Sequence, residues 1–182
     1  MDGTATIGVS ISIPSPWRAV LDTVRAGSGD PLAPFIPAHV TLLGPAEIRN
    51  GQLDEVREHL GAVAARHRPY AMHLRGTGTF RPVTEVVFVA VADGGGECAS
   101  LASDVRGGPL ARELLFPYHP HVTVAHDVPT DALDRVSAEL AGFEARFTVD
   151  HFTLYVHDTD GRWRPLGDFD LTGPGGLADG GP

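Results

Sequence analysis

A His-apolar-Thr-apolar phrase occurs twice in this chain, at residues 39–42 and 121–124, each time shortly after a proline. The first copy reads His-Val-Thr-Leu and the second His-Val-Thr-Val. Because alternate side chains of a β-strand share a face, we expect the histidine and threonine of each copy to lie side by side. Each strand would then present an imidazole that titrates near neutral pH beside a hydroxyl that donates hydrogen bonds.

Two imidazoles facing one cleft suit concerted acid–base catalysis. A neutral imidazole takes a proton from water and an imidazolium gives one to a leaving oxygen, each typically worth about 10²–10⁴-fold in rate. The hydroxyls of Thr41 and Thr123 can donate hydrogen bonds to phosphoryl oxygens. The alternative is that His39 and His121 are structural and satisfied by hydrogen bonds in the core. Recurrence of the whole phrase in a duplicated setting favours a functional pair that brackets a phosphodiester without a metal ion.

The elements around the two copies follow the same order. Each copy is followed by a helix and then strands, so the chain reads as an internal duplication with halves at about 4–93 and 97–171. Residues 173–182 are rich in Gly and Pro, and we expect them to be disordered beyond a single domain spanning 1–172. The periodicities predict strands at 4–13, 39–43, 70–79, 84–92, 146–157 and 162–171, and helices at 16–26, 51–66, 97–115 (interrupted at 107–109) and 130–141.

Two copies of such a unit suit a bilobal α+β fold. We expect two lobes related by a pseudo-two-fold axis, with antiparallel sheets lining a central cleft and helices outside. Symmetry would bring the two polar strand faces into that one cleft.

Composition limits the partners. The 182-residue chain has a net charge of −9, and all 14 of its basic residues are arginine, which argues against a grip on extended duplex nucleic acid. Its one cysteine excludes an intramolecular disulfide. No apolar run is long enough to span a bilayer, and the first residues show no signal-peptide pattern. We expect a cytoplasmic monomer with no membrane contact.

Several other residues could contact a substrate near the cleft. Phe80, Phe116 and Tyr118 lie in predicted loops, where an aromatic ring could stack on a nucleobase or simply pack the loop. Arg81 could pair with a phosphate or lie solvated on the surface. His119 could sit at the rim of the cleft.

Three further features have competing interpretations. Histidines 119, 121 and 126 could form a zinc site, but strand alternation does not make them converge, and we expect no metal and no cofactor. Cys98 begins a predicted helix, and we expect it to pack rather than react. Trp17 and Trp163 are interpreted as core or hairpin residues.

The paired motif resembles that of the two-histidine (2H) phosphoesterases, which include the 2′–5′ RNA ligase-like proteins and the RNA cyclic phosphodiesterases. The resemblance covers about residues 4–171. It implies a bilobal fold with a water-filled cleft, in which His39 and His121 take the acid and base roles and Thr41 and Thr123 bind phosphate. Members of the superfamily hydrolyse 2′,3′-cyclic phosphates to 2′-phosphates, act on other phosphodiesters or join RNA ends by a 2′–5′ link.

The expected function is therefore metal-independent hydrolysis of a 2′,3′-cyclic phosphate at an RNA end or on a nucleotide. Two alternatives stay open. One is 2′–5′ ligation of RNA, which is the same chemistry in reverse, and the other is noncatalytic binding of nucleotides. Which histidine is the acid and which the base also stays open.

Overall fold

The computed structural model describes residues 3–174, and the part of the expected tail from residue 175 onward lies outside them. The chain forms two four-stranded sheets in which every pair of neighbouring strands is antiparallel. The elements are β1 (Thr4–Ser12), α1 (Trp17–Gly27), β2 (His39–Arg49), η1 (Asn50–Gln52), α2 (Leu53–Ala64), β3 (Tyr70–Thr79), β4 (Val86–Asp93), α3 (Gly95–Val105), η2 (Gly108–Leu110), β5 (His121–His126), α4 (Thr130–Glu139), β6 (Glu144–Val149), β7 (His151–His157) and β8 (Trp163–Asp170).

The two sheets repeat one arrangement around the motifs. The first sheet has the order β2-β1-β7-β8 and the second the order β5-β4-β3-β6. In each sheet the strand that carries the motif is an edge strand, and its neighbour is the strand that precedes it along the chain. The predicted bilobal α+β fold is thereby confirmed.

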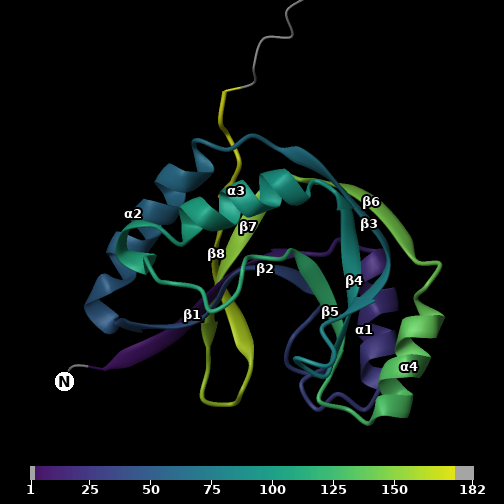
Figure 1. Ribbon diagram of the computed structural model, residues 1–182. Coiled ribbons are helices and arrows are strands. Elements are labelled where there is room, and N and C mark those ends of the chain that lie inside the picture. Colours follow the sequence, from purple (N-terminus) through teal and green to yellow (C-terminus); the bar gives the residue numbers. More distant parts are fainter. Residues whose placement is uncertain (1–2, 175–182) are drawn as a thin grey trace, which may run out of the picture.

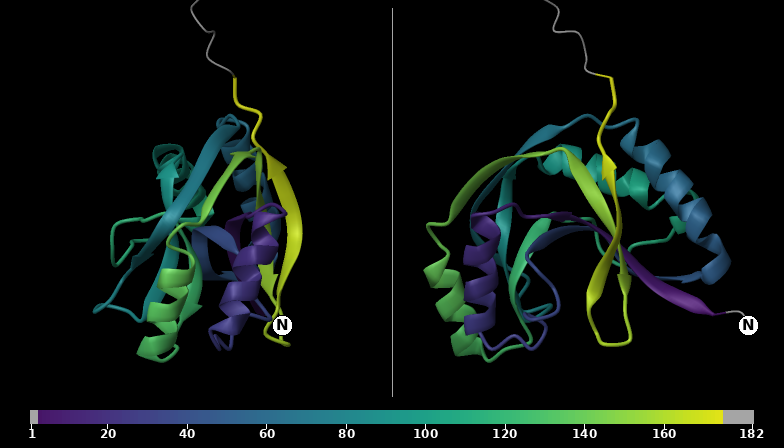
Figure 2. Two further views of the ribbon diagram at one scale, coloured as in Figure 1. Left: turned by 90° about the vertical axis from the view of Figure 1, so that its right-hand side faces the viewer. Right: turned by 180° about the vertical axis from the view of Figure 1, so that it is seen from behind.

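The helices lie outside the sheets, and α2 connects the first sheet to the second. Helices α1 and α4 lie together at one end of the molecule, and α2 and α3 pack together at the other (Figures 1 and 2). Helix α1 links two strands of the first sheet but packs against β5 of the second, and α3 packs in the reciprocal way against β2. Each lobe is therefore held by a helix from the other half of the chain.

The motif strands meet at the junction of the two sheets. Strands β2 and β5 contact each other although they belong to different sheets (Figure 1). Their apolar motif residues Val40, Leu42, Val122 and Val124 are at most 1% exposed and belong to one contiguous core. The histidines and threonines between them are half-buried on the opposite face, as strand alternation predicts.

Three element predictions are wrong. The strand predicted at 39–43 does not end before Gly44 and Pro45, because β2 continues to Arg49 across an irregularity in its pairing with β1 between Ile7 and Val9. The single strand predicted at 146–157 is two strands, because the chain leaves the second sheet after β6 and enters the first with β7. The helix predicted at 97–115 ends at Val105, and residues 111–120 form neither helix nor strand. Gly108 has a φ of +52°, in the left-handed region that favours glycine, and Pro109 follows it, so the helix does not continue.

Candidate active site

The two motif histidines are held in the same way. The Nδ1–H of His39 donates to the carbonyl of Pro37 at 2.8 Å, and the Nδ1–H of His121 donates to the carbonyl of His119 at 2.6 Å. In both cases the acceptor lies two residues upstream. A carbonyl oxygen only accepts, so the proton is assigned to Nδ1 in each ring. The lone pair or second proton of each imidazole is therefore carried by Nε2.

The electrostatic surroundings of both rings disfavour protonation. Burial lowers the pKa of His39, and the positive charges of Arg25 and His121 lower it further, against the raising effects of the Pro37 carbonyl and Asp22. Burial also lowers the pKa of His121, and the charge of His119 adds to this, against the raising effect of the His119 carbonyl. The charge of one imidazole thus acts on the other across the junction of the sheets.

The two motif threonines have hydroxyls that are free to bind a ligand. Within residues 3–174, neither Thr41 nor Thr123 uses its side-chain hydroxyl in a hydrogen bond to the protein. Both side chains are half-buried on the face of their histidine. Each half of the molecule therefore offers one imidazole and one unengaged hydroxyl from adjacent positions of one strand face.

Tyr118 connects the two motifs. Its hydroxyl donates to the backbone carbonyl of Thr41 at 2.8 Å and lies 3.3 Å from the Sγ of Cys98. The guanidinium of Arg106 lies 5.0 Å from the centre of its ring. Tyr118 precedes His121 by three residues, so this bond ties the approach to the second motif to the backbone of the first.

The surroundings of Cys98, next to Tyr118, disfavour a role as a nucleophile. Cys98 is fully buried, and burial raises the pKa of its thiol. This agrees with the packing role expected from the sequence.

Aromatic rings surround His121. The ring centroid of Phe80 lies 4.9 Å from that of His121, with the planes at 89°, and the ring of Phe88 lies 5.3 Å away. Both phenyl rings also contact the imidazole of His119, at 5.4 and 5.2 Å. Of the predicted contacts, Phe80 and His119 thus lie directly beside a candidate catalytic ring.

Two other predicted contacts are placed differently. The guanidinium of Arg81 donates to Asp134 at 2.8 Å, so a phosphate would have to compete with this carboxylate. Phe116 is 67% exposed on the loop that leads to β5, next to two further exposed apolar residues, Leu114 and Leu115. Their substrate roles stay predictions.

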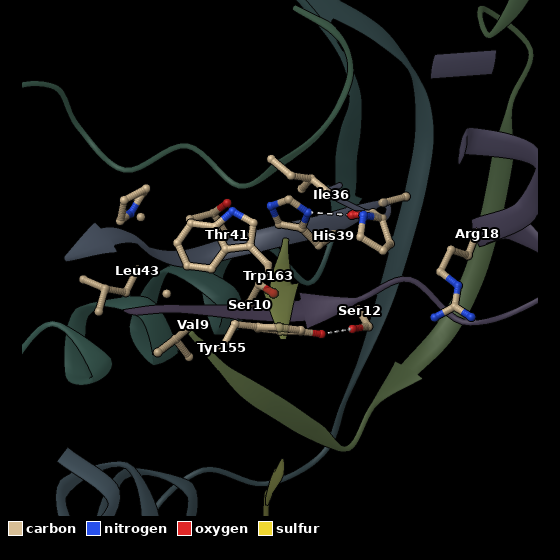
Figure 3. Close-up of a pocket in the computed structure, with 15 residues that line it drawn as sticks. Val9, Ser10, Ser12, Arg18, Ile36, His39, Thr41, Leu43, Tyr155 and Trp163 are labelled. Atoms are coloured by element: carbon tan, nitrogen blue, oxygen red, sulfur yellow. Dashed lines mark hydrogen bonds between the residues drawn. The ribbon is translucent and has the colours of Figure 1, made fainter. Parts of the chain in front are cut away.

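A pocket opens beside His39 and Thr41, and sequence reasoning missed most of its residues. Figure 3 shows the side chains of Ser10, Ser12, Tyr155 and Trp163 around the imidazole. In the strand register Ser12 is the partner of His39 and Ser10 the partner of Thr41. The hydroxyls of Ser12 and Tyr155 are 2.9 Å apart. Alternation of Ser with Ile along β1 was the available signal, but only the register shows that these hydroxyls extend the polar face of the motif.

Trp163 was interpreted as a core or hairpin residue, and it does begin β8 in the β7–β8 hairpin. It also lines the pocket. A Cβ at Gly8 would lie only 3.0 Å from its indole ring, so the glycine allows the ring to lie close to β1.

The zinc alternative has no geometric basis in the residues that the structure describes. The rings of His119 and His121 lie 5.7 Å apart between centroids. Among residues 3–174, no three His, Cys, Asp or Glu side chains are arranged to hold a metal ion. No helix in the same range is long and apolar enough to cross a membrane.

Each of the two edge strands thus presents a histidine anchored to a backbone carbonyl and, two residues on, a threonine whose hydroxyl bonds to no described residue. The family model described as "2'-5' RNA ligase superfamily" matches residues 13–161 of the chain. The chain belongs to this superfamily.

Individual relatives agree with this assignment. A protein of Bacillus cereus (strain G9842) named "Putative phosphoesterase" is 27% identical over 138 residues, which cover 74% of this chain and 78% of that protein. The crystal structure of E. coli LigT in apo form is 25% identical, with a TM-score of 0.70, and covers 93% of this chain and 99% of its own. The crystal structure of E. coli LigT complexed with 3′-AMP is 24% identical, also with a TM-score of 0.70, over 92% of this chain and 98% of its own.

Proposed function

We propose that this protein hydrolyses 2′,3′-cyclic phosphodiesters, on nucleotides or at RNA ends, with His39 and His121 as general acid and base. The observation that carries the proposal is the matched anchoring of the two rings. Each Nδ1–H is engaged by a carbonyl two residues upstream, which leaves Nε2 of both rings for proton transfer. E. coli LigT, a relative by fold, has been crystallised with 3′-AMP, a ribonucleotide phosphate of the same chemical class as the proposed product.

The proposed reaction moves one proton at each ring. The neutral imidazole takes a proton from water at Nε2 while the water oxygen forms a bond to phosphorus. The bond from phosphorus to the ribose 3′-oxygen breaks, and the imidazolium on the other side gives its Nε2 proton to that oxygen. The product is a 2′-phosphate, and the two imidazoles have exchanged protonation states.

The threonines would stabilise the charge that develops on phosphorus. The hydroxyls of Thr41 and Thr123 donate to the two non-bridging oxygens in this proposal, where negative charge builds up in the transition state. No step requires a metal ion, because proton transfer and hydrogen bonding supply the activation.

The direct test is turnover of nucleoside 2′,3′-cyclic phosphates in EDTA. We expect His39→Ala and His121→Ala each to lose about 10²–10⁴-fold in kcat, while the control His151→Ala, whose ring pairs with Asp150 at 2.6 Å on β7, keeps wild-type activity. Full activity in either motif variant would overturn the assigned roles. Tight nucleotide binding without turnover would instead identify a noncatalytic binding protein.

Joining of RNA ends is the second candidate, because the family's description names it. It is the same displacement at the cyclic phosphate with a different nucleophile: the 5′-hydroxyl of a second RNA end takes the place of water, forms the bond to phosphorus and gives up its proton to the base, while the bond to the ribose 3′-oxygen breaks and that oxygen takes a proton from the acid. The net charge of −9 makes a grip on long RNA less favourable. Product analysis with RNA fragments that end in a cyclic phosphate separates the two, since ligation lengthens the fragment and hydrolysis leaves its length unchanged.

A further inference from the structure

The pocket beside His39 has two chemically different ends. Figure 3 shows Val9 and Leu43 on one side of the imidazole and Ser12 and Arg18 on the other side, and the indole of Trp163 lines the pocket near Gly8 of β1. One end is thus apolar and aromatic, whereas the other carries hydroxyls and a guanidinium. His39 and Thr41 lie between the two ends.

Arg18 is the one basic side chain among the residues that line this pocket, histidine aside. Its guanidinium makes no hydrogen bond or ion pair with any residue in the described range 3–174, although many other arginines of the chain are paired. The acidic residue on the same helix, Asp22, is engaged elsewhere, because its Oδ1 accepts from the backbone N–H of Ala38 at 2.7 Å. An exposed cation in a chain of net charge −9 is thus left without a counter-ion at the mouth of the pocket.

We propose that Arg18 forms a second anion subsite, so that the substrate is a cyclic phosphodiester that carries a second phosphate. This inference rests on the proposed function for the position of the reacting phosphate, and adds what the substrate must carry beyond it. A guanidinium binds phosphate oxygens with two parallel hydrogen bonds, which sets the distance and orientation of the second group. With the second phosphate on Arg18, the cyclic phosphate would lie between the imidazoles of His39 and His121.

The second phosphate has two chemical sources. It is either the 5′-phosphate of a mononucleotide or the diester that joins the terminal nucleotide of an RNA to its neighbour. A 5′-phosphate carries more negative charge than a diester, so a mononucleotide should gain more from Arg18. If the dinucleotide instead gains as much in kcat/KM as the mononucleotide, or more, the source of the second phosphate is an RNA end.

The test compares kcat/KM for three substrates: a nucleoside 2′,3′-cyclic phosphate, the same compound with a 5′-phosphate, and a dinucleotide that ends in the cyclic phosphate. We expect Arg18→Ala to lower kcat/KM about 10- to 100-fold for substrates with the second phosphate, and to leave the first substrate unchanged. Arg18→Lys should recover part of the loss, because lysine keeps the charge without the bidentate geometry. Arg68→Ala, which removes another exposed arginine outside the pocket, should change none of the three.

Ionic strength gives a second readout. The preference of the wild type for the second phosphate should fall as salt rises, since the guanidinium is exposed and its charge is screened. An equal effect of Arg18→Ala on all three substrates, or no effect on any, would overturn the inference.

A binding measurement keeps this inference separate from the proposed function. Calorimetry with adenosine 2′-phosphate and adenosine 2′,5′-bisphosphate needs no turnover. Tighter binding of the bisphosphate that is lost in Arg18→Ala would support the subsite even if no cyclic phosphate is hydrolysed, in which case only the proposed function falls. Equal binding of both compounds by the wild type would overturn the subsite.

Discussion

The surroundings of the first motif differ from those of the second although the backbone repeats. On the neighbouring strand, Ser12 and Ser10 are the register partners of His39 and Thr41. At the second motif the partners of His121 and Thr123 are Ala90 and Phe88. The first histidine therefore lies against hydroxyls in an open pocket, and the second lies against phenyl rings.

The two motif sites share the features that proton transfer would need and differ in the features that would bind the rest of a substrate. The repeated features are those that proton transfer needs, namely the carbonyl-anchored ring and the adjacent hydroxyl. The features that diverge are the cross-strand neighbours, which decide what else fits beside each ring. In our interpretation the first sheet, which carries His39, binds the body of the substrate, and the second sheet, which carries His121, holds its histidine rigidly.

The largest expected effect is a difference in activity between His39→Ala and His121→Ala. With a phosphodiester whose leaving group is a p-nitrophenolate, the leaving oxygen needs little protonation, so loss of the general acid should cost far less than loss of the base. We expect one of His39→Ala and His121→Ala to retain most of its activity on this substrate and the other to lose about 10²–10⁴-fold. Equal losses in steady-state kcat would contradict a division into acid and base.

Substitution of an aromatic residue should have different effects in the two sheets. Phe88 is 6% exposed and packs against Phe80 at 4.5 Å, so Phe88→Ala should cost about 3–5 kcal/mol in the free energy of unfolding. Trp163→Ala should instead raise KM about 10-fold and lower stability less, because the indole lines an open pocket. Denaturant unfolding and steady-state kinetics on both variants check this, and a KM effect confined to Phe88→Ala would contradict the assignment of substrate binding to the pocket of the first sheet.

Tyr118→Phe should sharpen the comparison by removing the one side-chain hydrogen bond from this residue to the first motif. The phenyl ring keeps the packing, but the Thr41 carbonyl loses its donor. We expect kcat to fall about 3- to 10-fold with little change in KM, in line with about 0.5–1.5 kcal/mol for one hydrogen bond. A change in KM alone would show that the hydroxyl contacts substrate rather than positioning Thr41.

The smallest effect is on pH dependence. Both imidazoles have a pKa below the ordinary value of about 6.5, and the active form needs one of them protonated. The bell-shaped profile of kcat/KM should therefore have its maximum below pH 6.5 and decline as rising pH deprotonates the acid. Burial is the main cause that lowers the pKa of His121, and the charge of His119 adds a smaller contribution. His119→Gln removes only that smaller contribution, so the limb of the profile that reports His121 should move slightly to higher pH. A maximum above pH 7 in the wild type would contradict the pKa directions.

The sequence predicts the parts that depend on local order. The alternation of Val40 and Leu42 with His39 and Thr41 is local, and the structure places these residues on opposite faces as expected. The change of sheet between β6 and β7 is not a local feature. The alternation of apolar and polar residues looks the same whether the chain continues one strand or begins a new strand in another sheet. The pocket residues Tyr155 and Trp163 come from β7 and β8, whose neighbours are fixed only by tertiary pairing.

The meeting of two edge strands has a consequence for how this architecture can diversify. Strands β2 and β5 are paired in separate sheets, so the separation of the imidazoles is set by side-chain packing and by the helices that cross between the lobes. Substitutions in α1 or α3 can widen or narrow that gap without breaking a ladder in either sheet. If the proposed function holds, a scaffold of this kind can accept phosphodiesters of new sizes while the geometry around each histidine stays unchanged.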